Sequence, residues 1–130
     1  MSVWVEYNPN PVKISEEDDC AVRAVAAALG VDWDEAYQMI AHNARMMGTM
    51  MHKNPAWGSV LRQHGFRRAI IPNMCPDCYT AEDFCREHPR GVFVLGFYNH
   101  VATVLNGKLM DAFDSSREVP IYYWYRRDDF

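Results

Sequence analysis

The chain has 130 residues, of which 49% are hydrophobic and 23% charged, and its formal net charge at pH 7 is -4. This length and composition are typical of one globular domain, which we expect to span residues 1–130. The negative charge and the lack of a basic stripe argue against nucleic acid as a partner, and no stretch reaches the roughly 18 apolar residues of a membrane helix. The first ten residues carry no secretory signal pattern, so we expect a reducing cytoplasm.

The first two thirds of the chain predict one strand followed by helices. Residues 3–7 alternate like a short strand, and the NPNP turn at residues 8–11 ends it. Helix signals come next, and residues 69–72 then predict a short buried strand. The expected helix boundaries are a C-cap at Gly30, a capping box at Asp32 and Glu35, an N-terminal Asn54-Pro55 pair and a closing Gly65.

A short helix predicted from Thr80 to His88 is followed by a change of hydrophobic period after Gly91. From there the segments are rich in β-branched and aromatic residues, which is typical of strands. The four expected strands cover residues 92–98, 100–105, 108–113 and 119–125. Helices that precede strands in this way predict an α+β fold, with N-terminal helices packed on a C-terminal antiparallel sheet.

Asn106 and Gly107 form the strongest short hairpin signal in the chain. A two-residue turn there places His100 opposite Phe113 and makes His100 and Asp111 diagonal neighbours on one face. A carboxylate in that place fixes the tautomer of the imidazole and supports its protonated form. Without a nucleophile elsewhere, the alternative is a half-buried histidine beside an edge aspartate.

Cys20 lies where the acidic residues 16–19 give way to an apolar helix. With Asp19 as the N-cap, the thiol takes the first helical position, where backbone N–H groups favour a thiolate. The acidic residues act in the opposite sense, so an ion pair with His100 has to outweigh them. Two alternatives stay open: a cap at Ser15, which places Cys20 one turn deeper, and a cysteine that is packed as a small hydrophobe.

Two segments carry a resemblance to known proteins: DDCAVRAVAAALG at residues 18–30 and HPRGVFVLGFYNHVATVLNGKLMDAFDSS at residues 88–116. The order Cys, His, Asp, on a helix start followed by strands, resembles the papain-like cysteine peptidase fold. More narrowly, the segments are similar to small bacterial and phage proteins with an Asp-Cys-x-x-Arg-Ala helix, a Gly-His strand and an Asp-x-Trp-Asp-Ser segment. The likeness spans residues 4–124 loosely and is tight in the two segments.

The resemblance implies a catalytic triad in which Cys20 is the nucleophile, His100 the general base and Asp111 the residue that orients it. The hairpin argument selects Asp111 independently, in preference to Asp114. The resemblance also implies a bacterial cell or a phage-infected host as the location.

The expected oxyanion site differs from the family pattern. Ile14 stands six residues before Cys20, where papain-like enzymes usually place a glutamine, and Asp18 stands where the resembling proteins tend to have asparagine. Asp18 and Asp19 are the candidate side chains at this site, but an ionised carboxylate cannot donate a hydrogen bond. The backbone N–H of Cys20 is then left as the expected donor.

A second cluster of candidate residues lies in CPDCYTAEDFCREH, residues 75–88. Cys75 and Cys78 form a CxxC turn, and Cys85 and His88 lie three apart on one helical face. Three thiolates and an imidazole suit a closed tetrahedral zinc site. The alternative is a set of free or core cysteines with no cofactor, since Cys85 also has the spacing of a core position.

The sequence therefore predicts a cysteine-dependent hydrolase that cleaves a peptide or another amide, with a peptide or protein as substrate. Two other classes remain: a catalytically inactive papain-like module, for instance a phage-encoded one, that binds a protein partner, and a zinc-stabilised interaction domain in which Cys20 is inert.

Overall fold

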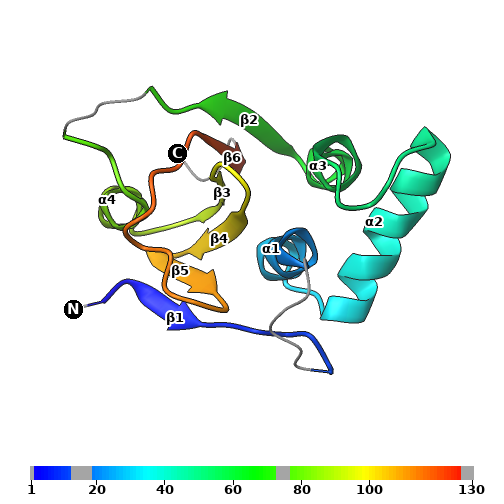
Figure 1. The fold of residues 1–130 in the computed structure, drawn as a ribbon, viewed down its shortest axis with the longest axis horizontal. Coiled ribbons are helices and arrows are strands. Elements are labelled where there is room, and N and C mark those ends of the chain that lie inside the picture. Colours follow the sequence, from blue (N-terminus) through cyan, green and yellow to red (C-terminus); the bar gives the residue numbers. More distant parts are fainter. Residues whose placement is uncertain (1, 13–18, 73–76, 127–130) are drawn as a thin grey trace.

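The computed structural model describes residues 2–12, 19–72 and 77–126, which form four helices and one six-stranded sheet (Figure 1). Among these residues no helix combines the length and the apolar character needed to cross a membrane. The helices are α1 (Cys20–Leu29), α2 (Trp33–Met47), α3 (Asn54–Gln63) and α4 (Ala81–Glu87). The strands are β1 (Trp4–Glu6), β2 (Phe66–Ile70), β3 (Val92–Gly96), β4 (Val101–Leu105), β5 (Lys108–Asp111) and β6 (Tyr122–Arg126).

The sheet has the strand order β1-β5-β4-β3-β6-β2 and is mixed. Its neighbours pair antiparallel except at one edge, where β1 runs parallel to β5 with Trp4 opposite Leu109. The C-terminal strands pair antiparallel as expected, and the N-terminal strand β1 adds a parallel edge to them. No hairpin joins β1 to β5, because the helices and most of the strands lie between them in the chain, so local turn geometry does not set their direction.

The helices are divided between the two faces of the sheet, which confirms the predicted α+β class. Helices α1, α2 and α3 share one core with the face of the sheet that carries Val94, Val101, Tyr122 and Trp124. Helix α4 covers the opposite face with Phe93 and other large apolar side chains. Successive residues of β3 point alternately into the two cores, as expected for a strand that is buried on both faces.

The predicted caps of α1, α2 and α4 are confirmed, whereas the expected Asn54 cap of α3 is wrong: Lys53 is the N-cap, Asn54 is already helical, and Gly65 follows the C-cap His64. Gly30 ends α1 with a positive φ of 68°, and the carboxylate of Asp32 accepts a hydrogen bond of 2.8 Å from the N–H of Glu35 at the start of α2. Thr80 and Asp83 form a capping box at α4. Strand β2 begins earlier than the expected residues 69–72, because its backbone pairs with β6 from Phe66 onward.

The β4–β5 hairpin has the predicted turn and register. Asn106 and Gly107 both have positive φ, at 49° and 77°, as a two-residue hairpin turn requires. Thr103 lies opposite Met110 and Leu105 opposite Lys108. When this pairing is continued by one residue, Asp111 lies opposite Ala102, which makes Asp111 a diagonal neighbour of His100.

Candidate active site

Cys20 is the first residue of α1, and Asp19 is its N-cap. The carbonyl of Asp19 accepts the first hydrogen bond of the helix, 2.9 Å from the N–H of Arg23. The N–H groups of the first turn therefore have no helical carbonyl to bond, and they give this end of the helix a partial positive charge. The thiol is half-buried at that end, which confirms the placement predicted with Asp19 as the cap.

Strand β4 and the residue before it hold the imidazole next to this helix end. The hydroxyl of Thr103 on β4 donates a hydrogen bond of 2.7 Å to the carbonyl of Ala24 on α1, and both groups are buried. His100 directly precedes β4, and its carbonyl accepts a hydrogen bond of 2.7 Å from the N–H of Phe97. The ring of Phe113 lies 4.8 Å from that of His100, centroid to centroid, which agrees with the predicted cross-strand pair.

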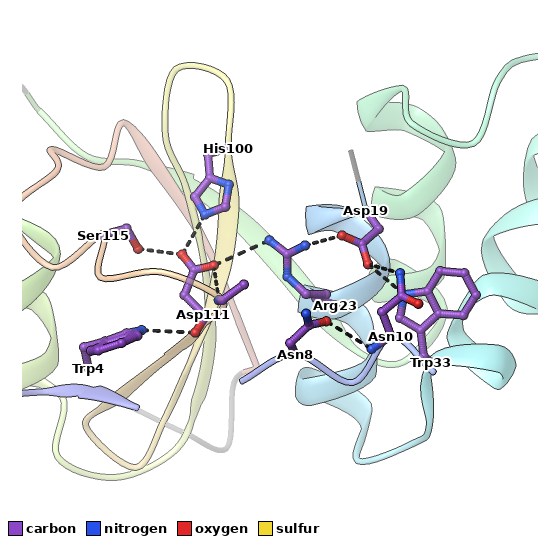
Figure 2. Close-up of polar contacts among 10 residues, drawn as sticks. Trp4, Asn8, Asn10, Asp19, Arg23, Trp33, His100, Asp111 and Ser115 are labelled. Carbon is purple, nitrogen blue, oxygen red and sulfur yellow. Dashed lines mark hydrogen bonds and ion pairs between the residues drawn. The ribbon is translucent and has the colours of Figure 1, made fainter. Parts of the chain in front are cut away.

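Nε2 of His100 lies 2.6 Å from Oδ2 of Asp111 (Figure 2). Asp111 is 1% exposed, and its carboxylate also accepts hydrogen bonds from the Ser115 hydroxyl at 2.6 Å and from the N–H of Ala112 at 2.8 Å. Three donors therefore hold this carboxylate in a fixed orientation toward the imidazole.

The surroundings of His100 favour its charged form. Burial lowers the pKa of His100, but hydrogen bonds with Asp111 and Cys20, together with the charges of these two groups, outweigh burial and raise the pKa to about 9. Since Nε2 bonds to Asp111, Nδ1 is the ring nitrogen left for the sulfur of Cys20.

The surroundings of Cys20 favour its thiolate. Burial raises the pKa of Cys20, but a hydrogen bond with His100, another from the N–H of Val101, and the positive charges of His100 and Arg23 together lower it below its ordinary value. A lowered pKa of a thiol beside a raised pKa of an imidazole is what a thiolate–imidazolium pair produces. The structure thus brings Cys20, His100 and Asp111 together, as the sequence predicted.

Asp19 is the N-cap that the sequence predicted, but its side chain is not available to an oxyanion. Its carboxylate is buried and contacts Arg23, the side-chain amide of Asn10 at 3.1 Å and the indole N–H of Trp33 at 2.9 Å (Figure 2). It makes no side-chain cap to α1, and it accepts hydrogen bonds from all three partners. The structure therefore does not make Asp19 an oxyanion donor, and Asp18 lies outside the described residues.

Arg23 links the two buried carboxylates. Its guanidinium bonds to Asp19 through Nη1 and lies 3.5 Å from Oδ1 of Asp111 through Nη2. Figure 2 shows this row of groups running from His100 through Asp111 and Arg23 to Asp19. Sequence reasoning assigned no role to Arg23 or Ser115. The spacing of four residues between Asp19 and Arg23 was a visible signal for the first half of the row.

The second predicted cluster is not assembled into a metal site among the described residues. Cys78 is in a disulfide bond, and the thiol of Cys85 is buried on α4, where burial raises its pKa to about 12. Nδ1 of His88 lies 2.8 Å from the carbonyl of Phe84. No group of three potential metal ligands occurs in the described part of the chain, and Cys75 lies outside it.

A cleft of about 720 Å³ opens beside the sulfur of Cys20. Its lining includes His100 and Val101, Asn54 and Trp57 of α3, and Tyr122 of β6. Cys20 and His100 therefore face a space into which a peptide-sized group can enter, while Asp111 lies buried behind His100.

Comparisons with protein-family models, with curated proteins and with solved structures found no match to this chain.

Proposed function

We propose that the protein is a cysteine-dependent hydrolase of the papain-like kind that cleaves a peptide or another amide. The observation that supports it most is the hydrogen-bonded series from Cys20 through His100 to Asp111 at the edge of a cleft. Each member meets a requirement of this chemistry: a thiol with lowered pKa, an imidazole with raised pKa, and a buried carboxylate that fixes the ring.

In the first step the thiolate of Cys20 attacks the carbonyl carbon of the amide, and an electron pair of the C=O bond moves to the oxygen. The C–N bond then breaks as Nδ1 of the His100 imidazolium gives its proton to the leaving nitrogen. This leaves a thioester on Cys20 and a neutral imidazole. A water molecule next attacks the thioester while His100 accepts its proton, and the C–S bond breaks to release the acid.

The oxyanion of the tetrahedral intermediate requires hydrogen-bond donors close to Cys20. The N–H of Cys20 itself is our proposed donor, because it lies at the N-terminal end of α1, where helix N–H groups have no helical acceptor. The carboxylate of Asp19 acts indirectly: it forms an ion pair with Arg23, and Arg23 in turn lies beside Asp111.

Digestion of a complex peptide mixture by the full chain tests the proposal, with new peptide termini and acylated Cys20 detected by mass spectrometry. We expect new termini with the wild-type chain and none with Cys20→Ala. A wild-type chain that forms neither new termini nor an acyl adduct, although its Cys20 is rapidly alkylated, would contradict hydrolysis. That result would favour the catalytically inactive binding module.

A further inference from the structure

The cleft beside Cys20 has a positively charged lining. Arg68 lines it together with His100, and none of the described residues around it is an aspartate or a glutamate. This differs from the chain as a whole, whose formal net charge is -4. The charges of Cys20 and His100 offset each other, so Arg68 gives the cleft a positive charge that attracts substrates of the opposite sign.

Arg68 is held in this cleft by an aromatic contact. It lies on β2 opposite Trp124, on the face of the sheet that packs against the helices. Its guanidinium carbon lies 4.2 Å from the centre of the Tyr122 ring. Among the described residues no carboxylate lies within ion-pair distance of Arg68, so the charge that it presents to the cleft is not neutralised by a neighbour.

Tyr122 is itself fixed in position by a glycine. Its ring lies directly over Gly96, so closely that a β-carbon at Gly96 would be 2.0 Å from Cζ of the ring. Its hydroxyl has no hydrogen-bond partner among the described residues. Burial raises the pKa of Tyr122, so the hydroxyl keeps its proton and can donate.

A further donor without a partner lies next to this cleft. The indole N–H of Trp124 is buried and makes no hydrogen bond in the described part of the chain. Trp124 lines an adjoining depression of about 410 Å³ that shares Arg68 with the cleft. Buried polar groups normally have partners, so this donor is an exception in the described part of the chain.

We propose that the cleft selects amide substrates with an acidic side chain next to the scissile bond, and that Arg68 is the specificity-determining residue that binds this carboxylate. Guanidinium groups bind carboxylates through two parallel hydrogen bonds, and the stacked position on Tyr122 leaves the edge of the Arg68 guanidinium available for them. The inference rests on the proposed function, since it assigns a substrate class to the same cysteine site.

The test compares two alkylating probes, N-chloroacetyl-aspartic acid amide and N-chloroacetyl-asparagine amide. They differ in the side chain, a carboxylate against a carboxamide, and their C-terminal carboxylates are both blocked. Each reacts with a thiolate by forming an S–C bond as the C–Cl bond breaks and chloride leaves. The second-order rate of Cys20 labelling is followed by mass spectrometry on the full chain, so the readout does not depend on hydrolysis.

We expect the acidic probe to label wild-type Cys20 faster than the neutral probe, and Arg68→Gln to slow the acidic probe by about tenfold while leaving the neutral probe unchanged. Arg67→Gln is the matched control, because Arg67 neighbours Arg68 on the same exposed strand but pairs with Tyr125 on the opposite face. It should change neither rate.

An acidic-to-neutral rate ratio that is the same in the wild type and in Arg68→Gln would overturn the substrate assignment and leave the cysteine site intact. Labelling of Cys20 by the neutral probe at no more than the rate of a free thiol would instead overturn the proposed function, and the substrate assignment with it.

Discussion

His100 and Asp111 are eleven residues apart in the chain, and a two-residue turn brings Nε2 of one to 2.6 Å from Oδ2 of the other. The hairpin thus builds the imidazole–carboxylate half of the site by local structure alone. Cys20 joins it from the other end of the chain because α1 packs across β4, where Thr103 bonds to Ala24. The following predictions separate the contributions of these parts.

Asp111→Asn should lower the pKa of His100 from about 9 toward the ordinary value of a histidine, because a neutral amide removes the negative charge and the charged hydrogen bond. The thiolate fraction of Cys20 at neutral pH should fall with it, since a neutral imidazole no longer stabilises the anion. The pH dependence of iodoacetamide labelling at Cys20 measures both changes. Asp114→Asn is the matched control, since Asp114 is an exposed carboxylate that bonds to Ser116. An identical shift in both variants would contradict the role of Asp111.

Hydrolysis and alkylation should differ in their dependence on pH. Both need the thiolate, so both rates rise through the lowered pKa of Cys20. Hydrolysis also needs protonated His100 to donate to the leaving group, so kcat/KM should fall again as the pH rises through about 9. Alkylation has no such requirement and should stay high. A parallel fall of both rates near that pH would show that His100 is not the general acid.

Arg23→Ala should destabilise the fold by about 3–5 kcal/mol, because it leaves the buried carboxylate of Asp19 without a cation and leaves Asp111 with His100 alone. Urea denaturation measures the free energy of unfolding. Arg86→Ala is the control: its pair with Glu82 has the same spacing of four residues, but both side chains are largely exposed, and the loss should be under about 1 kcal/mol. Equal losses of unfolding free energy in Arg23→Ala and Arg86→Ala would mean that burial of the Arg23 ion pairs does not increase their contribution to stability.

Gly96→Ala should destabilise the fold by about 1–3 kcal/mol, since the new methyl group and the ring of Tyr122 cannot occupy the same space. Adding Tyr122→Ala in the Gly96→Ala background should then cost less than Tyr122→Ala alone, because the steric conflict has been removed. A double-mutant cycle by urea denaturation gives this coupling energy. Strict additivity of the two substitutions would contradict the close contact.

Elemental analysis of the purified chain tests the zinc hypothesis for Cys75, Cys78, Cys85 and His88. We expect less than one zinc per chain, because Cys78 is oxidised and Cys85 is buried with a pKa of about 12. One equivalent of zinc that is lost in Cys85→Ser would contradict this expectation and restore the hypothesis of a structural metal site.

The parts of the site that local signals determine were predictable from the sequence. The Asn106-Gly107 turn sets the register that pairs His100 with Asp111, and an acidic residue before an apolar helix places Cys20 at the first helical position. Both depend on residues close together in the chain, where turn and cap preferences act directly.

The parts that depend on packing between distant segments were not predictable. Strand β1 joins the sheet parallel to β5, and no local pattern near Trp4 indicates its direction. Arg23 meets Asp111 only because α1 crosses β4, so its position between two carboxylates follows from tertiary structure. The side chain of Asp19 was expected near the oxyanion, but its carboxylate is bonded to Trp33, Asn10 and Arg23, two of which come from outside α1.

The ultraviolet absorbance of the thiolate, titrated with pH as a difference between the wild type and Cys20→Ala, tests the central claim most directly. A thiolate–imidazolium pair predicts that the Cys20 absorbance develops at a lower pH than the ordinary thiol pKa of about 8.5, and that His100→Ala moves its appearance to higher pH. Absorbance that develops only near the ordinary pKa of a thiol, at the same pH with and without His100, would contradict the proposed nucleophile.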